Sequence, residues 1–193
     1  MARHLLGSGS RGRGDDHRRA RLRSRIAAPP EKRHSGGLSA LARNFSYVVR
    51  NRRFVGYAAT FALGFGAMFA YFSASAFVTQ DLLGGLSPGQ FSMVFAANSI
   101  GLVGANVVNT RLIGRIEVRA LLRFGVTLLC TSGILLLTAA IVAGTERWVI
   151  LPLLWTCVSS LGFVIGNATA LGQSQVTSAA GTGSAVMGAS QFG

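Results

Sequence analysis

Four stretches of the chain are apolar on every side and almost free of charged side chains. They predict transmembrane helices over residues 54–80, 88–112, 122–144 and 148–173, because about 20 apolar residues of helix cross the roughly 30 Å core of a bilayer. A soluble bundle would need a polar face on each helix, and the segment GILLLTAAIVAG has none. The pattern therefore predicts an all-α membrane protein.

A fifth apolar segment, residues 182–193, runs to the end of the chain. Its length of about 18 Å as a helix is a little over half of the bilayer core. A helix that ends there leaves its last carbonyl groups in hydrocarbon, which is costly. We expect this segment to be the start of a fifth span, and the chain to be an incomplete part of a longer protein.

The loop before the second span carries a helix-start signature. Ser87 is placed as the N-cap, Pro88 as the first helical residue and Gln90 as the third. This spacing predicts a capping box that begins the helix at Pro88.

Positive charge is concentrated at one end of the chain and in one loop. Residues 1–53 contain 14 of the 19 Lys and Arg residues. The loop between the second and third spans adds the basic group Arg111, Arg115, Arg119 and Arg123. Positive loops stay in the cytoplasm, so we expect an inner or plasma membrane protein that spans the bilayer several times, with residue 53 inside and residues 81–90 outside.

The charge pattern also divides the chain into three parts. Residues 1–36 form a basic head that we expect to be disordered, residues 37–53 a cytoplasmic amphipathic linker, and residues 54–193 the helical bundle. The favoured interpretation of the head is a misassigned or out-of-frame start in GC-rich DNA, because it is rich in Arg, Gly, Ala and Ser. A lipid-binding arm and, less favoured, nucleic-acid binding through RGRG stay open.

The linker has apolar residues at helical spacing. These are Leu38, Leu41, Phe45, Val48 and Val49. They predict a short amphipathic helix that lies on the inner face of the membrane.

Polar side chains inside the spans are few and lie on shared faces. Asn98 and Asn109 are nearly three full helical turns apart, and Asn106 lies within about 80° of them. On the fourth span, Ser160 and Asn167 share a face with Thr156. Because an unpaired amide is costly in hydrocarbon, these groups either bond between helices or line a wet cavity.

Small residues predict where helices pack closely. The stripe on the first span includes Ala62, Gly66 and Ala70, and that on the fourth contains Gly162 and Gly166. The second stripe points roughly opposite to the polar face of its helix.

The sequence holds no constellation typical of an enzyme. The span interiors have no Asp, Glu, Lys, Arg or His, and proton relays usually need such groups. Cys130 and Cys157 lie in apolar runs without metal-ligand spacing. We predict no catalytic residues, no metal and no cofactor.

Several motifs, in order, resemble the C-terminal half of Bcr/CflA-type drug-resistance transporters of the major facilitator superfamily. They are NRRFVGYA, FAYFSASAFVTQ, LSPGQFSMVFAANSIGLVGANVVNTRLIGRI and NATAL followed by AAGTGSAVMGASQFG. The resemblance begins at about Pro29. It implies part of a six-helix half, with four full helices and the start of a fifth. In that family two such halves enclose the substrate.

The resemblance implies proton-coupled efflux of drugs or small metabolites by the full-length relative. We expect the chain to be inactive alone and to need the missing N-terminal half or a partner chain. The alternative is a half-transporter or a non-catalytic membrane scaffold, and a membrane-tethered nucleic-acid binder is less favoured. Candidate residues lining the substrate cavity are Tyr71, Asn98, Asn109, Ser160 and Asn167.

Overall fold

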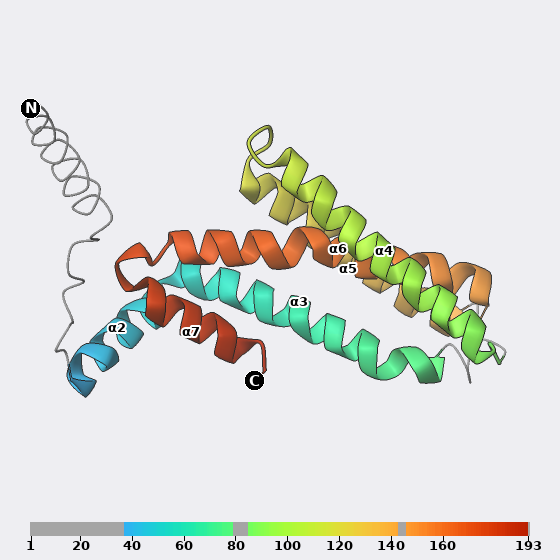
Figure 1. Ribbon diagram of the computed structural model, residues 1–193, viewed down its shortest axis with the longest axis horizontal. Helices are drawn as coiled ribbons and strands as arrows, with labels where there is room; N and C mark the ends of the chain where they lie inside the picture. The colour runs from blue at the N-terminus through green and yellow to red at the C-terminus, as the bar shows by residue number, and fades with distance from the viewer. Residues whose placement is uncertain (1–36, 79–84, 143–145, 193) are drawn as a thin grey trace, which may run out of the picture. The chain divides into compact units, whose positions relative to one another are not determined.

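The computed structural model describes residues 37–78, 85–142 and 146–192, and these residues are almost entirely helical (Figure 1). The chain divides into two units, Met1–Leu38 and Ser39–Gly193. The predicted disorder of the basic head lies outside the described residues. The elements are α2 (Leu38–Arg50), α3 (Arg52–Phe77), α4 (Pro88–Leu112), α5 (Val118–Val142), α6 (Arg147–Ser174), the short 3-10 helix η2 (Thr177–Ala179) and α7 (Ala180–Ser190).

Four of these helices are long and apolar enough to cross a membrane, namely α3, α4, α5 and α6. The predicted fold class, an all-α membrane protein with four full spans, is confirmed. Helix α7 (Ala180–Ser190) follows them and overlaps residues 182–193, the segment that we predicted as the start of a fifth span.

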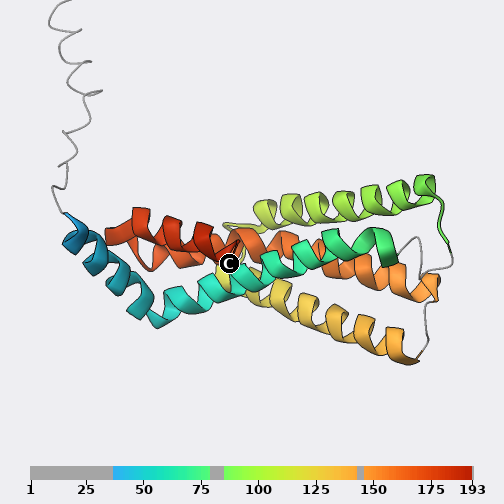
Figure 2. The same cartoon turned by 90° about the horizontal axis from the view of Figure 1, so that it is seen from below.

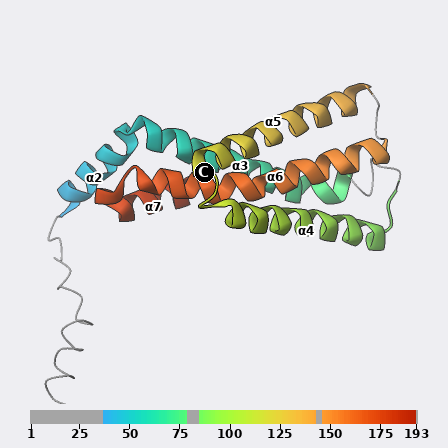
Figure 3. The same ribbon diagram turned by 90° about the horizontal axis from the view of Figure 1, so that it is seen from above.

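Helix α6 is the central element of the second unit. It packs against α3, α4 and α5, and Figures 2 and 3 show α4 and α5 running along opposite sides of it. Every residue from Val158 to Val164 is buried, so this part of α6 is covered on all sides. The other three long helices are mostly exposed and present apolar surface outward.

The main hydrophobic core lies toward the end of the bundle where α3 begins and α6 ends. Its fully buried members include Val48, Phe54, Val164, Ala168 and Val176. Helix α7 turns back after α6 and adds Met187 to this core. The core therefore joins α2, α3, α6 and α7 at one end of the bundle. Arg50, Arg52 and Arg53 lie at this end, which is called the arginine-bearing end below.

The predicted capping box at the start of α4 is confirmed. The Gln90 N–H donates to the Ser87 hydroxyl at 3.3 Å, and the Ser87 N–H donates to Gln90 Oε1 at 3.0 Å. Pro88 occupies the first turn, where its missing N–H leaves no hydrogen bond unmade. This local sequence alone determines where α4 begins.

Asn51 joins two helices at the arginine-bearing end, and sequence analysis missed it. Its Oδ1 accepts from the N–H groups of Arg53 and Phe54 at 3.1 and 3.2 Å, which caps α3. Its Nδ2 donates to the carbonyl of Gln175, just after α6, at 3.1 Å. One side chain thus satisfies a helix start and attaches it to a helix end.

Two substitutions separate these two roles of Asn51. Asn51→Ala removes both, and we expect it to lower the free energy of unfolding by about 1–3 kcal/mol from the lost cap and hydrogen bond. Asn51→Ser keeps a capping oxygen, a preferred N-cap group, and removes only the amide that donates to Gln175, so it should be less destabilised. Unfolding midpoints in detergent measure the order. Equal midpoints for the two variants would show that the cap contributes nothing.

Candidate functional site

Two asparagines that lie far apart in the sequence form a buried pair between α4 and α6. The Asn167 Nδ2 donates to Asn109 Oδ1 at 2.7 Å, and the Asn109 Nδ2 donates to Asn167 Oδ1 at 3.4 Å. Asn167 Nδ2 also donates to the carbonyl of Phe163. Both side chains are almost fully buried, so for this pair the structure favours bonding between helices over exposure to a cavity.

A second polar position, Asn98, lies on α4 about three helical turns before Asn109. Asn98 is 2% exposed, and its Nδ2 donates to the carbonyl of Val94 in its own helix. Its Oδ1 is buried and has no partner of normal hydrogen-bond geometry among the described residues, although the Tyr71 side chain lies next to the amide. Asn98 therefore has a buried acceptor without a hydrogen bond among the described residues.

Aromatic rings of α3 and α4 contact one another next to this second position. Tyr71 stacks on Phe95 with ring centroids 6.0 Å apart, and Phe72 and Phe91 also contact Phe95 at 6.0 Å. The cluster of Tyr71, Asn98 and these three rings is called the α3–α4 aromatic cluster below. It combines flat apolar surfaces with one buried carbonyl-type acceptor and one hydroxyl group.

Ser160 belongs to neither group. It is fully buried, and its hydroxyl donates to the carbonyl of Cys157 in the same helix at 2.6 Å. The structure thus brings together Tyr71 with Asn98, and Asn109 with Asn167, but leaves Ser160 satisfied within α6.

A further contact between α4 and α6 was not predicted from sequence. Trp155 Nε1 donates to the carbonyl of Ala97 at 2.9 Å, and a Cβ on Gly101 would meet the Trp155 ring at 2.6 Å and clash with the Ser159 hydroxyl. Ala97 with Trp155 and Asn109 with Asn167 have the same sequence separation of 58 residues. The two helices therefore run parallel, and Gly101 allows their close approach.

The glycines predicted to pack on α6 behave differently from each other. A Cβ on Gly162 would lie 2.8 Å from Asn106 N and 2.8 Å from Leu102 O, whereas Gly166 meets nothing within 4 Å. Gly162 and Asn167, which helical spacing places on roughly opposite sides of α6, both contact α4. The backbone of α4 lies against the glycine, and about one turn later the Asn109 side chain reaches across to Asn167.

On α3 the close contact is made two residues before the predicted one. A Cβ on Gly64 would lie 3.3 Å from Val164 Cγ1, but one on Gly66 would meet nothing within 4 Å. Two residues correspond to about 200° around a helix, so Gly66 lies on the side away from α6. Ala62 is partly buried and Ala70 is exposed. Among the described residues, the packing predicted for Gly66 is not made.

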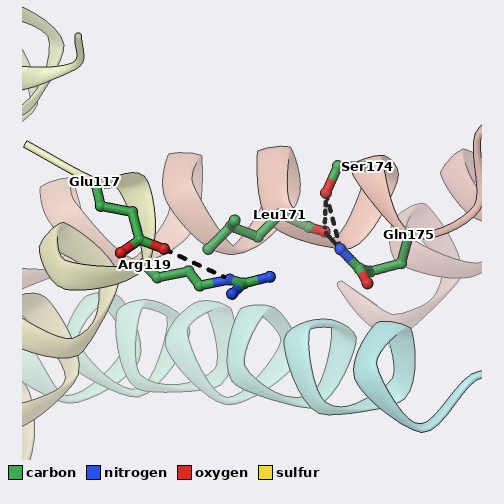
Figure 4. Close-up of polar contacts among 5 residues, drawn as sticks. All are labelled: Glu117, Arg119, Leu171, Ser174 and Gln175. Atoms are coloured by element: carbon green, nitrogen blue, oxygen red, sulfur yellow. Dashed lines mark hydrogen bonds and ion pairs between the residues drawn. The ribbon is translucent and has the colours of Figure 1, made fainter.

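The basic loop lies at the arginine-bearing end of the bundle. Arg111, Arg115, Arg119 and Arg123 are all exposed. Arg119 Nε lies 3.9 Å from Glu117 Oε1 (Figure 4). Nearby, at the end of α6, Gln175 Nε2 donates to Ser174 Oγ and to the Leu171 carbonyl. The exposed Arg119–Glu117 ion pair contributes little to stability. The loop keeps a net positive charge, and the positive-inside rule uses such charge to assign loops to the cytoplasmic side.

Within residues 37–78, 85–142 and 146–192, no three His, Cys, Asp or Glu side chains come close enough to hold a metal ion. The groups that α3, α4 and α6 offer inside the spans are amides, hydroxyls and aromatic rings. These groups donate and accept hydrogen bonds, which suits recognition of a neutral or weakly polar molecule.

Comparison with known proteins identifies the family. The sequence model described as Major Facilitator Superfamily matches residues 15–193. The chain belongs to this superfamily. The match begins upstream of Pro29, so the family relationship extends into the basic segment that the sequence resemblance had left outside it.

Two curated relatives give the scale of the similarity. The chain is 28% identical over 167 residues to "Uncharacterized MFS-type transporter YdgK" of Bacillus subtilis, covering 86% of this chain and 41% of that protein. It is 25% identical over 163 residues to "Bicyclomycin resistance protein homolog" of Haemophilus influenzae, covering 80% of this chain and 38% of that protein. The chain spans about 40% of the length of these relatives. No solved structure matches significantly.

Membership in the major facilitator superfamily establishes the general class of the protein. It is a multi-pass membrane protein of a transporter family, and the prediction that it is not an enzyme is confirmed. The four long helices α3 to α6 are accordingly membrane spans of a partial transporter chain.

Proposed function

We propose that this chain is the C-terminal part of a small-molecule exporter that moves drugs or metabolites out of the cell in exchange for protons. The similarity to a protein named bicyclomycin resistance protein homolog carries the proposal. The earlier resemblance to Bcr/CflA-type transporters supports the same class. Transport by alternating access requires two bundles that move against each other, so the remaining helices of the family fold are needed for activity.

The α3–α4 aromatic cluster is our candidate for the substrate-contacting surface. Asn98 offers a carboxamide oxygen without a partner among the described residues, and Tyr71 is half buried beside it. A buried acceptor without a partner is costly, so a hydrogen-bond donor on a substrate would gain by bonding to it once the helices move apart during transport. The Asn109–Asn167 pair already satisfies its own groups, and we assign it to helix packing.

We further propose that proton coupling occurs outside this part of the transporter. Asp81, Glu117 and Glu146 lie in connections between the spans, and no acidic residue lies inside α3, α4, α5 or α6. Proton-driven transporters usually carry ionisable groups within the membrane. We propose that those groups reside in the helices that complete the fold.

Drug susceptibility in a host lacking its own exporters tests the function. The chain is expressed alone and also joined to the N-terminal half of the Haemophilus relative. We expect no resistance from the chain alone and a several-fold rise in the inhibitory concentration from the joined protein. Resistance from the chain alone would refute the requirement for further helices. A joined protein that reaches the membrane yet leaves the host sensitive to bicyclomycin and a panel of other drugs would refute the exporter proposal.

A further inference from the structure

We propose that α2 is an interfacial helix that binds the anionic lipid headgroups of the cytoplasmic leaflet. Its outward side carries an apolar stripe of Leu41, Phe45 and Val49, which are 60%, 53% and 45% exposed. Residues four apart lie on one face of a helix, so the three side chains form a continuous surface. A stripe of this kind, on a helix with a polar opposite side, is typical of helices that lie in the membrane interface.

The direction of this stripe is fixed by the bundle. Val48, which lies beside the stripe on the same helix, is fully buried in the core that also contains Phe54 and Met187. The Asn51 N–H donates to the Val48 carbonyl at 3.2 Å, and Asn51 itself caps α3 and binds Gln175. Helix α2 therefore cannot rotate to hide the stripe without losing these contacts.

The position of α2 along the chain keeps it close to the bilayer. A single residue, Asn51, separates the end of α2 from the start of the membrane span α3. The positive-inside rule places this end of the bundle in the cytoplasm. The nearest apolar medium for Leu41, Phe45 and Val49 is thus the inner leaflet.

The charges around α2 favour anionic lipid over a neutral surface. Arg43 and Arg50 lie on the helix and Arg52 and Arg53 follow it, all exposed, and none forms an ion pair with a described residue. No acidic residue occurs from Gly37 to Gln80. Four arginines without ion pairs, two of them on the polar side of a helix whose other side is apolar, match a layer of phosphate headgroups above acyl chains. Each basic residue near such a layer adds about 1 kcal/mol of attraction, or roughly fivefold in binding.

Spin-label accessibility of the full chain in vesicles containing phosphatidylglycerol tests the position of α2. In a Cys130→Ala, Cys157→Ala background, single labels are placed at Leu41 and Phe45 on the stripe and at Tyr47, an exposed position about 160° around the helix from Phe45. We expect the stripe labels to collide several-fold more with oxygen than with a water-soluble nickel complex, and the label at Tyr47 to show the reverse. Frequent collision of the stripe labels with the nickel complex would show that the stripe faces water. Infrequent collision with both reagents would show that protein covers the stripe. Either result overturns the proposal.

Lipid selectivity tests the charge component separately. A fluorophore at Phe45→Cys is quenched by dibrominated phosphatidylglycerol or dibrominated phosphatidylcholine in mixed vesicles. We expect several-fold stronger quenching by the anionic lipid, a fall toward equality in Arg43→Gln, Arg50→Gln or at high salt, and a ratio near one for a control label at Ile134 in α5. Equal quenching at Phe45 with both arginines present would overturn the anionic preference.

Discussion

Gly162→Ala is expected to destabilise the bundle more than almost any other single methyl addition to it. The new Cβ would lie 2.8 Å from Asn106 N and 2.8 Å from Leu102 O, both backbone atoms of α4, and 2.9 Å from Ala105 Cβ. Backbone atoms cannot rotate away as a flexible side chain can, so the two parallel helices must separate. Overpacking of this kind costs about 1–3 kcal/mol, and separation would also weaken the neighbouring Asn109–Asn167 hydrogen bonds.

The matched control lies one turn further along the same helix. A Cβ on Gly166 would meet nothing within 4 Å, and alanine has a higher helix propensity than glycine by about 1 kcal/mol. Gly166→Ala should therefore be neutral or stabilising. The measurement is the unfolding midpoint of both purified variants in the same detergent. If Gly162→Ala is as stable as Gly166→Ala, the close approach of α4 and α6 is wrong.

Asn167→Leu should produce the second large loss of stability. It leaves the Asn109 amide buried without its partner on α6, and an unsatisfied buried amide costs about 1–3 kcal/mol. Hydrogen bonds between membrane helices have measured contributions near the lower end of that range, about 0.6–2 kcal/mol. The expected loss is therefore about 1–2 kcal/mol.

The double variant separates a lost partner from a lost contact. Asn109→Leu combined with Asn167→Leu removes both amides, so it should be no less stable than Asn167→Leu alone. Asn106→Leu, at an exposed position of α4, controls for adding leucine to this helix. Strictly additive losses for Asn109→Leu and Asn167→Leu would mean that the two amides are not coupled.

The long elements of this fold are predictable because they depend on local sequence. Apolar length predicts the four spans, and the Ser87, Pro88 and Gln90 pattern predicts where α4 begins. These features require only a bilayer thickness and the hydrogen-bonding groups of one helix end. They need no knowledge of neighbouring helices.

The partners of each helix face are not predictable in the same way. Helical spacing placed Asn98 and Asn109 on one face, but it could not show that Asn109 would meet Asn167 while Asn98 would lie beside Tyr71. A stripe of small residues likewise selected Gly66, whereas the contact uses Gly64. Spacing gives the angle between residues on one helix, and only the packed bundle shows which angle faces another helix.

Asn51 and Trp155 illustrate a second reason. Each acts through a hydrogen bond to a backbone carbonyl, of Gln175 and Ala97 respectively. A backbone acceptor leaves no residue-specific pattern, because every residue has a carbonyl group. The cap formed by Asn51 could have been suspected, since asparagine directly before an apolar helix is a common N-cap.

Drug uptake into inverted membrane vesicles tests most directly whether this chain supplies the substrate-contacting surface of an exporter. The protein is the chain joined to the N-terminal half of the Haemophilus relative, with Asn98→Ala compared against Ser99→Ala, whose exposed hydroxyl is already bonded to the Phe95 carbonyl at 2.9 Å. We expect Asn98→Ala to reduce energised uptake about tenfold, as for the loss of one buried hydrogen bond of about 1.4 kcal/mol, and Ser99→Ala to leave it unchanged. Equal uptake by the two variants at equal protein levels would contradict the assignment of the α3–α4 aromatic cluster as the substrate site.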